Sequence, residues 1–173
     1  MARDEAASVN RRAEIVSAAI EVFAQIGYFR ATTAQVAERA SISQPYIFRF
    51  FATKEALLLT ALEVSWTRII EAFRQVVQSA APERLELELI EAYERILVSH
   101  RHETLLQMQA QTIQEPSIRD AMRGGFREVR HLVLEAFRAA GIPNPEERTL
   151  LFLAKGMLCN ISAALELPEL MEG

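Results

Sequence analysis

The fold is decided by the stretch from Ser41 to Leu57, SISQPYIFRFFATKEAL, in which four of the six residues YIFRFF are aromatic. Ser43 can cap a helix with its hydroxyl group. Gln44 and Pro45 then fall in the first turn, where proline is tolerated because its missing N–H has no intrahelical partner. The stretch therefore predicts a short helix over Gln44–Phe51. The question that it raises is which rings belong to the core and which face outward.

A helical wheel at about 100° per residue divides this helix into two sides. Ile47, Phe50 and Phe51 fall on one side, so we expect them to pack against the preceding helix. The other side carries the polar and aromatic residues Gln44, Pro45, Phe48 and Arg49, with Tyr46 at its edge. Glutamine can pair with adenine and arginine with guanine, and apolar carbons can contact a thymine methyl group. The outward set is typical of a surface that reads DNA, but a plain surface helix that happens to be aromatic has the same pattern.

Two further helices are predicted before this one. An apolar stripe recurs at helical spacing from Ile15 to Ile26, and Thr32 precedes a short helix over Thr33–Ala40. Gln35 follows Thr32 at the spacing of a capping box, in which each side chain satisfies a free backbone amide near the other. Because a short turn connects this helix to Gln44–Phe51, the two helices match a helix-turn-helix.

The remainder of the chain also has a helical period, and no convincing strand is predicted. A long helix begins after the cap Thr53 and ends before Pro82, and later helices cover about 85–97, 102–113, 117–140 and 145–166. The pair Gly124-Gly125 predicts a kink or a close backbone approach, because each glycine costs about 1 kcal/mol inside a helix. We therefore expect an all-α protein with a three-helix domain over residues 1–53 and a second helical domain over 54–173.

Composition narrows the class of protein. The net charge is −4, but residues 1–60 hold seven basic and six acidic side chains, so the acidic excess lies in the remainder. The N-terminal third is therefore the part that a polyanion would not repel. The single cysteine, Cys159, cannot form an internal disulfide bond and suits a reducing cytoplasm. We expect no membrane partner, because no signal segment is visible and the apolar run Leu150–Leu165 is short for a bilayer. An interface helix is the better interpretation of that run.

No motif points to catalysis. The sequence holds no G-x-G-x-x-G, P-loop, H-E-x-x-H or G-x-S-x-G motif, so we expect no enzyme activity and no cofactor. His100 and His102 point to different faces of a helix, which does not suit a shared metal ion. We interpret the segment 100–103 as a helix end with solvated charges.

The segment Arg12–Leu57 resembles the N-terminal domain of the TetR family of bacterial transcription regulators. The matching residues occur in the order that the family has: Ile15, Ala18, Ala19, Val22, Phe23, Gly27, Thr32, Thr33, Val36, Ala37, Ala40, Ile42, Ser43, Phe50, Phe51, Lys54, Glu55, Ala56 and Leu57. Beyond Leu57 the chain resembles the family in length and helical layout only.

The resemblance implies a dimer whose paired recognition helices read a pseudo-palindromic operator in double-stranded DNA. The implied contacts are Gln44, Pro45, Tyr46 and Arg49 for bases or nearby backbone, and Thr33, Ser43 and Lys54 for phosphates. Phe48 departs from the family pattern, which usually has a tyrosine whose hydroxyl meets a phosphate. Phe48 has no such donor, so we expect it to contact sugar or a thymine methyl group.

The family also implies a ligand cavity in the C-terminal helices. The candidate lining residues are Trp66, Ile69, Phe73, Tyr93, Met108, Met122 and Phe126, although such a stripe at helical spacing also forms plain core. We place a four-helix homodimer interface on the last two helices, about 117–140 and 145–166. Together these features indicate a repressor that a small, mostly apolar effector releases from DNA. The competing interpretations are an activator of the same family, a regulator controlled by a protein partner, and a helical small-molecule or lipid carrier that binds no DNA.

Overall fold

The computed structural model describes residues 2–172, with side chains from residue 8 onward. Within this range the protein is all-α, as predicted, and no strand occurs. The helices are α1 (Ala2–Ile26), α2 (Thr33–Arg39), α3 (Gln44–Ile47), α4 (Lys54–Ser79), α5 (Leu85–Ser99), α6 (Arg101–Ala110), α7 (Pro116–Ala139) and α8 (Pro145–Leu165), followed by a short 3-10 helix, η1 (Pro168–Met171).

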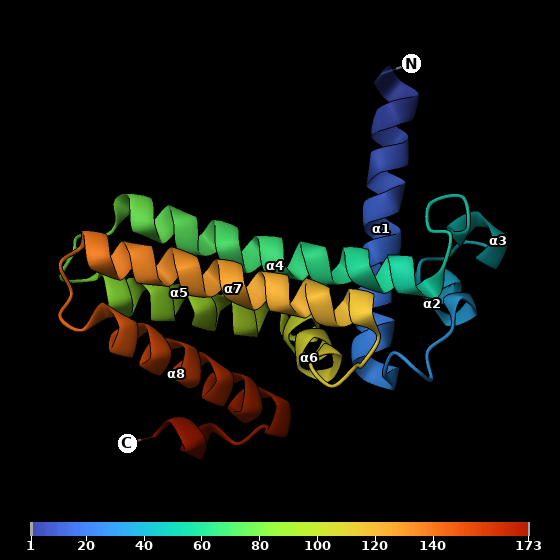
Figure 1. Ribbon diagram of the computed structural model, residues 1–173. Helices are drawn as coiled ribbons and strands as arrows, with labels where there is room; N and C mark the ends of the chain where they lie inside the picture. Colours follow the sequence, from blue (N-terminus) through green and yellow to red (C-terminus); the bar gives the residue numbers. More distant parts are fainter. Residues whose placement is uncertain (1, 173) are drawn as a thin grey trace.

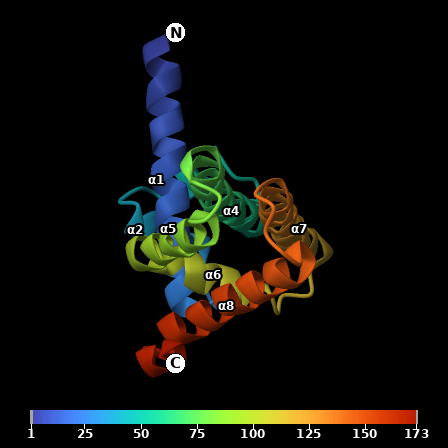
Figure 2. The ribbon, with the colours of Figure 1, turned by 90° about the vertical axis from the view of Figure 1, so that its left-hand side faces the viewer.

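The helices form an elongated body with α2 and α3 at one end (Figure 1). α4, α5, α7 and α8 run along the body, and α1 crosses it next to α2. In the end view these four long helices surround a common centre (Figure 2). α6 packs against α1, α4 and α8, so it joins the helix-turn-helix end of the molecule to the rest.

Two of the predicted helix caps are confirmed by their hydrogen bonds. The Gln35 amide donates to Thr32 Oγ1 at 3.2 Å, and the Thr32 amide donates to Gln35 Oε1 at 2.9 Å, which completes the capping box of α2. Thr53 Oγ1 accepts from the Ala56 amide at 3.0 Å and so caps α4. Ser43 and Asn144 stand at the predicted cap positions of α3 and α8, but neither side chain makes a cap hydrogen bond.

The recognition helix is shorter than predicted. Regular α-helix ends at Ile47 rather than at Phe51. The Arg49 amide then donates to the Tyr46 carbonyl at 3.2 Å, and the Phe50 amide to the Ile47 carbonyl at 2.9 Å. Bonds that span three residues tighten the last turn relative to an α-helix, as is common at helix ends. The prediction that Ile47, Phe50 and Phe51 face the core is still confirmed, because Ile47 and Phe51 are buried and Phe50 is half-buried against the core.

One continuous core joins the two predicted domains. It contains Phe23 and Ile47 from before residue 53, and Leu57, Phe73 and Phe137 from after it. The boundary between residues 53 and 54 therefore marks the start of α4 rather than a gap in packing. The division into 1–53 and 54–173 stays a prediction about function.

The glycine pair in α7 has two different environments. A Cβ atom on Gly125 would lie 2.2 Å from two ring carbons of Trp66, whereas a Cβ on Gly124 would meet nothing within 4 Å. The close backbone approach that the sequence predicts therefore occurs at Gly125. It lets the large indole of Trp66 lie directly against the backbone of α7.

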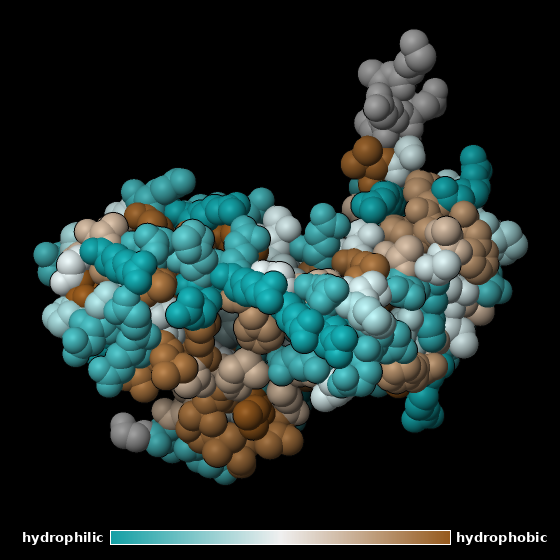
Figure 3. All heavy atoms as spheres, in the orientation of Figure 1, coloured by the Kyte–Doolittle hydropathy of each residue, from teal (hydrophilic) through white to brown (hydrophobic). Residues whose placement is uncertain are grey.

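α8 is apolar on two sides. One side carries Phe152 and Cys159 into the interior. The opposite side exposes the large apolar residues Leu150, Leu151, Leu158, Ile161 and Leu165. They form the apolar area over α8 in Figure 3. Among the described residues, α8 is the one helix long and apolar enough to cross a bilayer by length and composition, and 28% of its most apolar 18-residue window is buried.

Candidate nucleic-acid interface and ligand cavity

α3 presents its polar side to solvent and its apolar side to the core. Gln44, Pro45 and Arg49 are exposed, and 49% of Phe48 is exposed, whereas Ile47 is fully buried. The buried face anchors the helix, and this leaves the outward side chains free to meet another molecule. The helical wheel thus gives the burial of these residues correctly.

A hydrogen bond joins the first residues of α2 and α3. Gln44 Nε2 donates to Thr33 Oγ1 at 2.9 Å. The bond orients the Gln44 amide and leaves its carbonyl oxygen as an acceptor at the exposed surface. Two residues that were expected to contact DNA separately, one at a base and one at a phosphate, therefore form one unit.

Arg49 is held by stacking rather than by an ion pair. Its guanidinium carbon lies 5.2 Å from the centre of the Tyr46 ring, which packs edge-on against Phe50 with centroids 5.4 Å apart. Such a cation–π contact restrains the side chain but leaves the guanidinium donors free. In contrast, Arg39 Nε lies 2.6 Å from a carboxylate oxygen of Glu21. Arg49 therefore presents a free cation on the outward side of α3.

Lys54 does not face outward as expected for a phosphate contact. Its ammonium donates to the carbonyl oxygens of Tyr28 at 2.8 Å and Ala31 at 3.0 Å, and it lies 4.5 Å from the centre of the Tyr28 ring. The carbonyl of Phe29 lies at 3.5 Å. An ammonium group has three donors, and these contacts occupy them. Lys54 is the first residue of α4, and its bonds hold the loop between α1 and α2 against the start of that helix.

A cavity lies between the long helices and has a volume of about 60 Å³, room for a few water molecules. Five of the seven residues expected to line a ligand cavity do line it: Trp66, Ile69, Phe73, Tyr93 and Phe126. Met108 and Met122 do not. Met108 is half-buried beside Gln107, the residue that α6 does contribute, and Met122 is buried in the core one turn before Phe126.

Sequence reasoning missed the contribution of α8 to this cavity. The missed residues are Phe152, Leu153, Lys155, Gly156, Met157, Cys159 and Asn160 of α8, with Ile90, Gln107, Gln111 and Val129 from other segments. The run Leu150–Leu165 was interpreted only as an interface helix. Its second apolar side could have been recognised from the positions of Phe152, Gly156 and Cys159, which share one side of the helix.

The cavity holds few polar groups. Tyr93 donates its hydroxyl to Asn160 Oδ1 at 2.7 Å, and burial raises the pKa of Tyr93 to about 12, so the phenol stays neutral. Burial also raises the pKa of the Cys159 thiol. Lys155 is exposed at the rim. The buried Nε1 of Trp66 has no hydrogen-bond partner within the described part of the chain.

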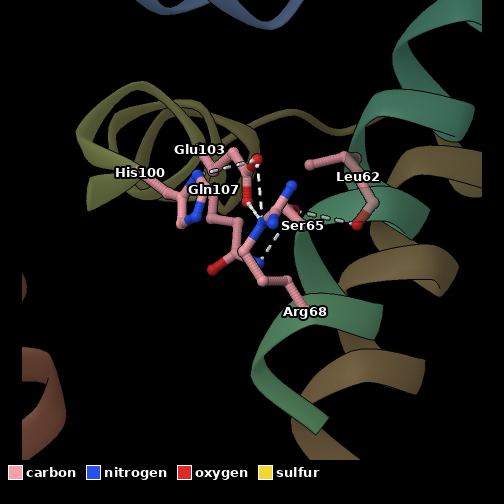
Figure 4. A network of polar contacts seen from close by, with 6 residues as sticks. All are labelled: Leu62, Ser65, Arg68, His100, Glu103 and Gln107. Atoms are coloured by element: carbon pink, nitrogen blue, oxygen red, sulfur yellow. Dashed lines mark hydrogen bonds and ion pairs between the residues drawn. The ribbon is translucent and has the colours of Figure 1, made fainter. Parts of the chain in front are cut away.

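Next to the cavity, a polar network connects α4 to α6 (Figure 4). Arg68 Nε lies 2.9 Å and 3.2 Å from the two oxygens of Glu103, and His100 Nδ1 lies 3.7 Å from one of them. Gln107 Nε2 donates to Ser65 Oγ at 2.9 Å. The interpretation of segment 100–103 as solvated charges is wrong for Glu103, because this residue is buried and bound by an arginine that lies 35 positions away. Residues 8–172 contain no group of three or more potential metal ligands.

Two side-chain bonds tie this region to the helix-turn-helix end. Gln109 Nε2 of α6 donates to the Ala24 carbonyl of α1 at 2.7 Å. Ser117 of α7 donates to the carboxylate of Glu55 in the first turn of α4. The cavity helices are thus in direct contact with the elements that position α3.

Comparison with known proteins finds a family match for the N-terminal segment. Residues 15–61 match the sequence profile described as bacterial regulatory proteins, tetR family. The HTH-type transcriptional activator FasR of Mycolicibacterium smegmatis is 31% identical over 77 residues, which are 44% of this chain and 35% of that protein. The HTH-type transcriptional regulator HbdR of Aromatoleum sp. is 27% identical over 130 residues, 75% of this chain and 57% of that protein. Neither match reaches two thirds of the relative's length.

Among solved structures, FadR from Bacillus subtilis in complex with stearoyl-CoA superposes with a TM-score of 0.75 and 15% identity, over 88% of this chain and 87% of that chain. The likeness in fold therefore extends well beyond the N-terminal helices. The N-terminal segment thus matches the tetR family of bacterial regulatory proteins, and the helices as a whole share the fold of a solved regulator.

Proposed function

We propose that this protein is a transcriptional repressor that binds a pseudo-palindromic operator as a dimer and is released by an effector. The proposal rests on the two sides of the α3 region: Ile47 is buried on one side, and Gln44 and Arg49 are exposed on the other. Amide and guanidinium groups on one outward face match the hydrogen-bonding edges of adenine and guanine in the major groove. The similar proteins FasR and HbdR are named as a transcriptional activator and a transcriptional regulator.

The base-reading role falls to Gln44 and Arg49 in this proposal. Tyr46 supports Arg49 through ring stacking, and Pro45 and Phe48 offer apolar carbons. Thr33 and Ser43 lie at the first turns of α2 and α3 and keep their roles as phosphate contacts. Lys54 is left out of the contact set, because its ammonium is bound to backbone carbonyls.

The proposed dimer forms mainly through α8. Its outward residues Leu151, Leu158 and Leu165 recur every seven positions and so form one apolar stripe. The large hydrophobic residues exposed on the described surface include five from α8 and none from α7. We therefore assign the centre of the interface to α8, with α7 at its polar border. Because the other side of α8 packs into the protein, a second copy suits its exposed side better than a lipid bilayer, in keeping with a cytoplasmic protein.

The proposed effector is small and mostly apolar and binds in the cavity. α4 is one uninterrupted helix whose first residue is tied to the loop before α2 and whose middle lines the cavity. An effector that moves α4 would move the recognition helices relative to each other. Because they must match successive major grooves about 34 Å apart, such a change weakens operator binding.

An activator is the second candidate, and FasR, which is similar over 44% of this chain, is named as one. The repressor and the activator share the same DNA surface and differ in the effect of binding on transcription. A regulator controlled by a protein partner would use that surface as well. A carrier without DNA binding is disfavoured by the exposed polar face of α3, which has no evident role in transport.

The test is selection of bound sequences from a random DNA pool, followed by titration in increasing salt and with small apolar compounds. A palindromic motif and an affinity that falls steeply with salt are expected. A reporter gene behind that motif then separates repression from activation. A protein that binds no DNA at low salt would contradict the proposal and favour the carrier.

A further inference from the structure

α7 carries a row of exposed arginines that are poorly neutralised within the protein. Arg119, Arg123, Arg127 and Arg130 are exposed and fall within an arc of about 80° on this helix. Arg123 lies 3.3 Å from Asp120, whose side chain is 70% exposed. No ion pair of the other three occurs within the described part of the chain. We call these four residues the arginine row. In a protein of net charge −4 they concentrate positive charge where an anionic partner can bind.

The arginine row lies beside the exposed apolar side of α8. Both ribbon views place α8 between α7 and the C-terminal η1 (Figures 1 and 2). A band of hydrophilic side chains over α7 lies directly above the apolar area of α8 in Figure 3. η1 is held on the other side of α8 by Ser162, whose hydroxyl donates to the Leu167 carbonyl at 2.9 Å. The apolar area of α8 therefore has α7 on one border and η1 on the other.

The border formed by η1 is acidic. Glu166 follows the last residue of α8, Glu169 lies in η1, and Glu172 follows η1; all three are exposed. Glu166 lies 2.8 Å from Arg101, whereas Glu169 and Glu172 have no ion pair among the described residues. The sequence holds no basic residue after Lys155. We call these three carboxylates the acidic border.

A symmetric dimer centred on α8 brings the two borders together. In a two-fold symmetric interface, each border of one copy lies against the opposite border of the other copy. The arginine row of one copy then faces the acidic border of its partner, and this contact occurs twice. The axis has to run along the body of the protein, because α3 lies at one end of the body and both α3 helices must reach the same duplex.

The two borders also match in their position along this axis. Phe137 of α7 and Phe152 of α8 pack with ring centroids 6.1 Å apart, so the two helices lie side by side at this point. Arg123 stands 14 residues before Phe137, and Glu166 stands 14 residues after Phe152, each about 21 Å along its helix. Because α7 and α8 run in opposite directions, both residues lie toward the same end of the body. A rotation about an axis along the body does not change that level.

From these observations we propose that the arginine row of each copy binds the acidic border of a second copy. The proposal rests on the proposed function, because it names the charged groups that surround the apolar centre of the proposed dimer. Apolar contact is non-directional, so the α8 surfaces alone permit more than one arrangement of the two copies. Charge pairs on both sides of this centre select one arrangement. They thereby fix the distance between the two α3 helices.

The test is a charge exchange between the two borders. The acidic variant combines Arg119→Glu with Arg123→Glu, and the basic variant combines Glu166→Arg with Glu169→Arg. Each variant places like charges on facing borders, so the dissociation constant of its homodimer should rise by about 10- to 100-fold. Mixing the two variants restores opposite charges at both contacts. The heterodimer should therefore form in preference to either homodimer, with a dissociation constant close to that of the wild type.

Sedimentation of the full chain, with a fluorescent label on one variant, measures homodimers and heterodimer separately. The matched control combines Arg30→Glu with Arg95→Glu, which reverses two exposed arginines in the loop between α1 and α2 and on α5. Neither has an ion pair among the described residues, and this variant should dimerise like the wild type. Homodimers of both variants as tight as the wild type, or a mixture without an excess of heterodimer, would overturn the proposal.

If a variant does not fold, as judged by circular dichroism, the wild-type dimer decides the matter. Its dissociation constant should rise several-fold between about 0.05 M and about 0.5 M NaCl, because salt screens exposed charge pairs. A dimer that does not respond to salt would overturn the proposal.

Binding of the wild type to DNA selected from a random pool is measured on the same preparations. A dimer that binds this DNA but tolerates the charge reversals overturns the present inference and leaves the proposed function intact. A dimer that binds no DNA overturns the proposed function, while a restored heterodimer still supports the charge contact. A wild-type monomer overturns both.

Discussion

The indole of Trp66 occupies the space that a side chain at Gly125 would need, 59 positions further along the chain. A Cβ atom there would lie 2.2 Å from two ring carbons, well inside contact distance. Trp66 is anchored in α4 and Gly125 in α7, so the pair fixes how closely these two helices approach. Trp66 also lines the cavity, so this contact helps to set the position of one cavity wall.

The glycine pair of α7 provides a matched test. Gly125→Ala should lower the free energy of unfolding by about 1–3 kcal/mol, because the added methyl group displaces the indole. Gly124→Ala should raise it by about 0.5–1 kcal/mol, since alanine restricts the unfolded chain and meets no neighbour. Denaturant unfolding of the two variants measures both effects. Equal changes in both variants would show that the indole moves aside freely.

Lys54 and Arg49 should separate fold stability from DNA binding. Lys54→Met removes an ammonium bound to two carbonyls, so the free energy of unfolding should fall by about 1.5–3 kcal/mol. Arg49→Ala should leave stability nearly unchanged but cost about 1–3 kcal/mol on the best operator, because a base contact is lost. It should also lower the salt dependence of DNA binding by about one unit per half-site, because a cation is removed from the DNA-facing side. Titrations in increasing salt with both variants measure this slope. A reduced slope in Lys54→Met, with stability intact, would restore the phosphate role for Lys54.

Gln44 is expected to read one base, with Thr33 as its support. Gln44→Ala should cost about 1–3 kcal/mol on the best operator and relax the preference at one base position. Thr33→Val keeps the shape of residue 33 and removes the acceptor of the 2.9 Å bond, so it should relax the same position to a smaller extent. Selection from a DNA pool with each variant reveals the position. A uniform loss of affinity across all sequences would remove Gln44 from the base-reading set.

Phe48→Tyr should strengthen DNA binding. The ring is 49% exposed on the outward side of α3, so a hydroxyl can be added without disturbing the core. If a phosphate lies within reach, the affinity should rise by about 0.5–1.5 kcal/mol per half-site, nearly independently of sequence. Parallel titrations against operator and scrambled DNA measure the gain. Unchanged or weaker binding to both would mean that no phosphate is free to accept a bond from residue 48, either because none lies there or because Tyr46 already holds it.

Leu158→Glu should convert the proposed dimer into a monomer at micromolar concentration. The carboxylate would lie at the centre of the apolar stripe on α8 and would be buried without a partner at the interface. Val98→Glu is the matched control, because Val98 is 84% exposed on α5 and away from this stripe. Light scattering on the two variants and the wild type gives the masses. A wild-type monomer, or a Leu158→Glu dimer, would contradict the proposed interface.

Short-range signals predicted much of the fold. The capping box of Thr32 and Gln35 and the cap Thr53 define helix starts through contacts three residues apart, which a sequence displays directly. The burial of Ile47 and exposure of Phe48 follow from helical periodicity within one turn. Such local features need no knowledge of the rest of the molecule.

Long-range contacts explain what the sequence did not reveal. Lys54 binds carbonyls that lie 23 and 26 positions away, and Glu103 pairs with an arginine 35 positions away. A charged side chain in isolation predicts a solvated or ligand-facing group, and only the packing of other helices redirects it. Only five of the sixteen residues that line the cavity were predicted, because the wall on α8 depends on how that helix packs against the others.

Because α4 is one uninterrupted helix, a small tilt of its packed middle part produces a larger displacement at its first residue. Lys54 and Trp66 are 12 residues apart on this helix, a span of about 18 Å, so a tilt of about 5° at the indole would displace the Lys54 end by about 1.6 Å. In a symmetric pair the two displacements add. An effector that tilts α4 in this way would shift the two recognition helices by about 3 Å relative to the 34 Å repeat of the duplex. The size of this displacement depends on the stiffness and length of α4 rather than on the size of the ligand.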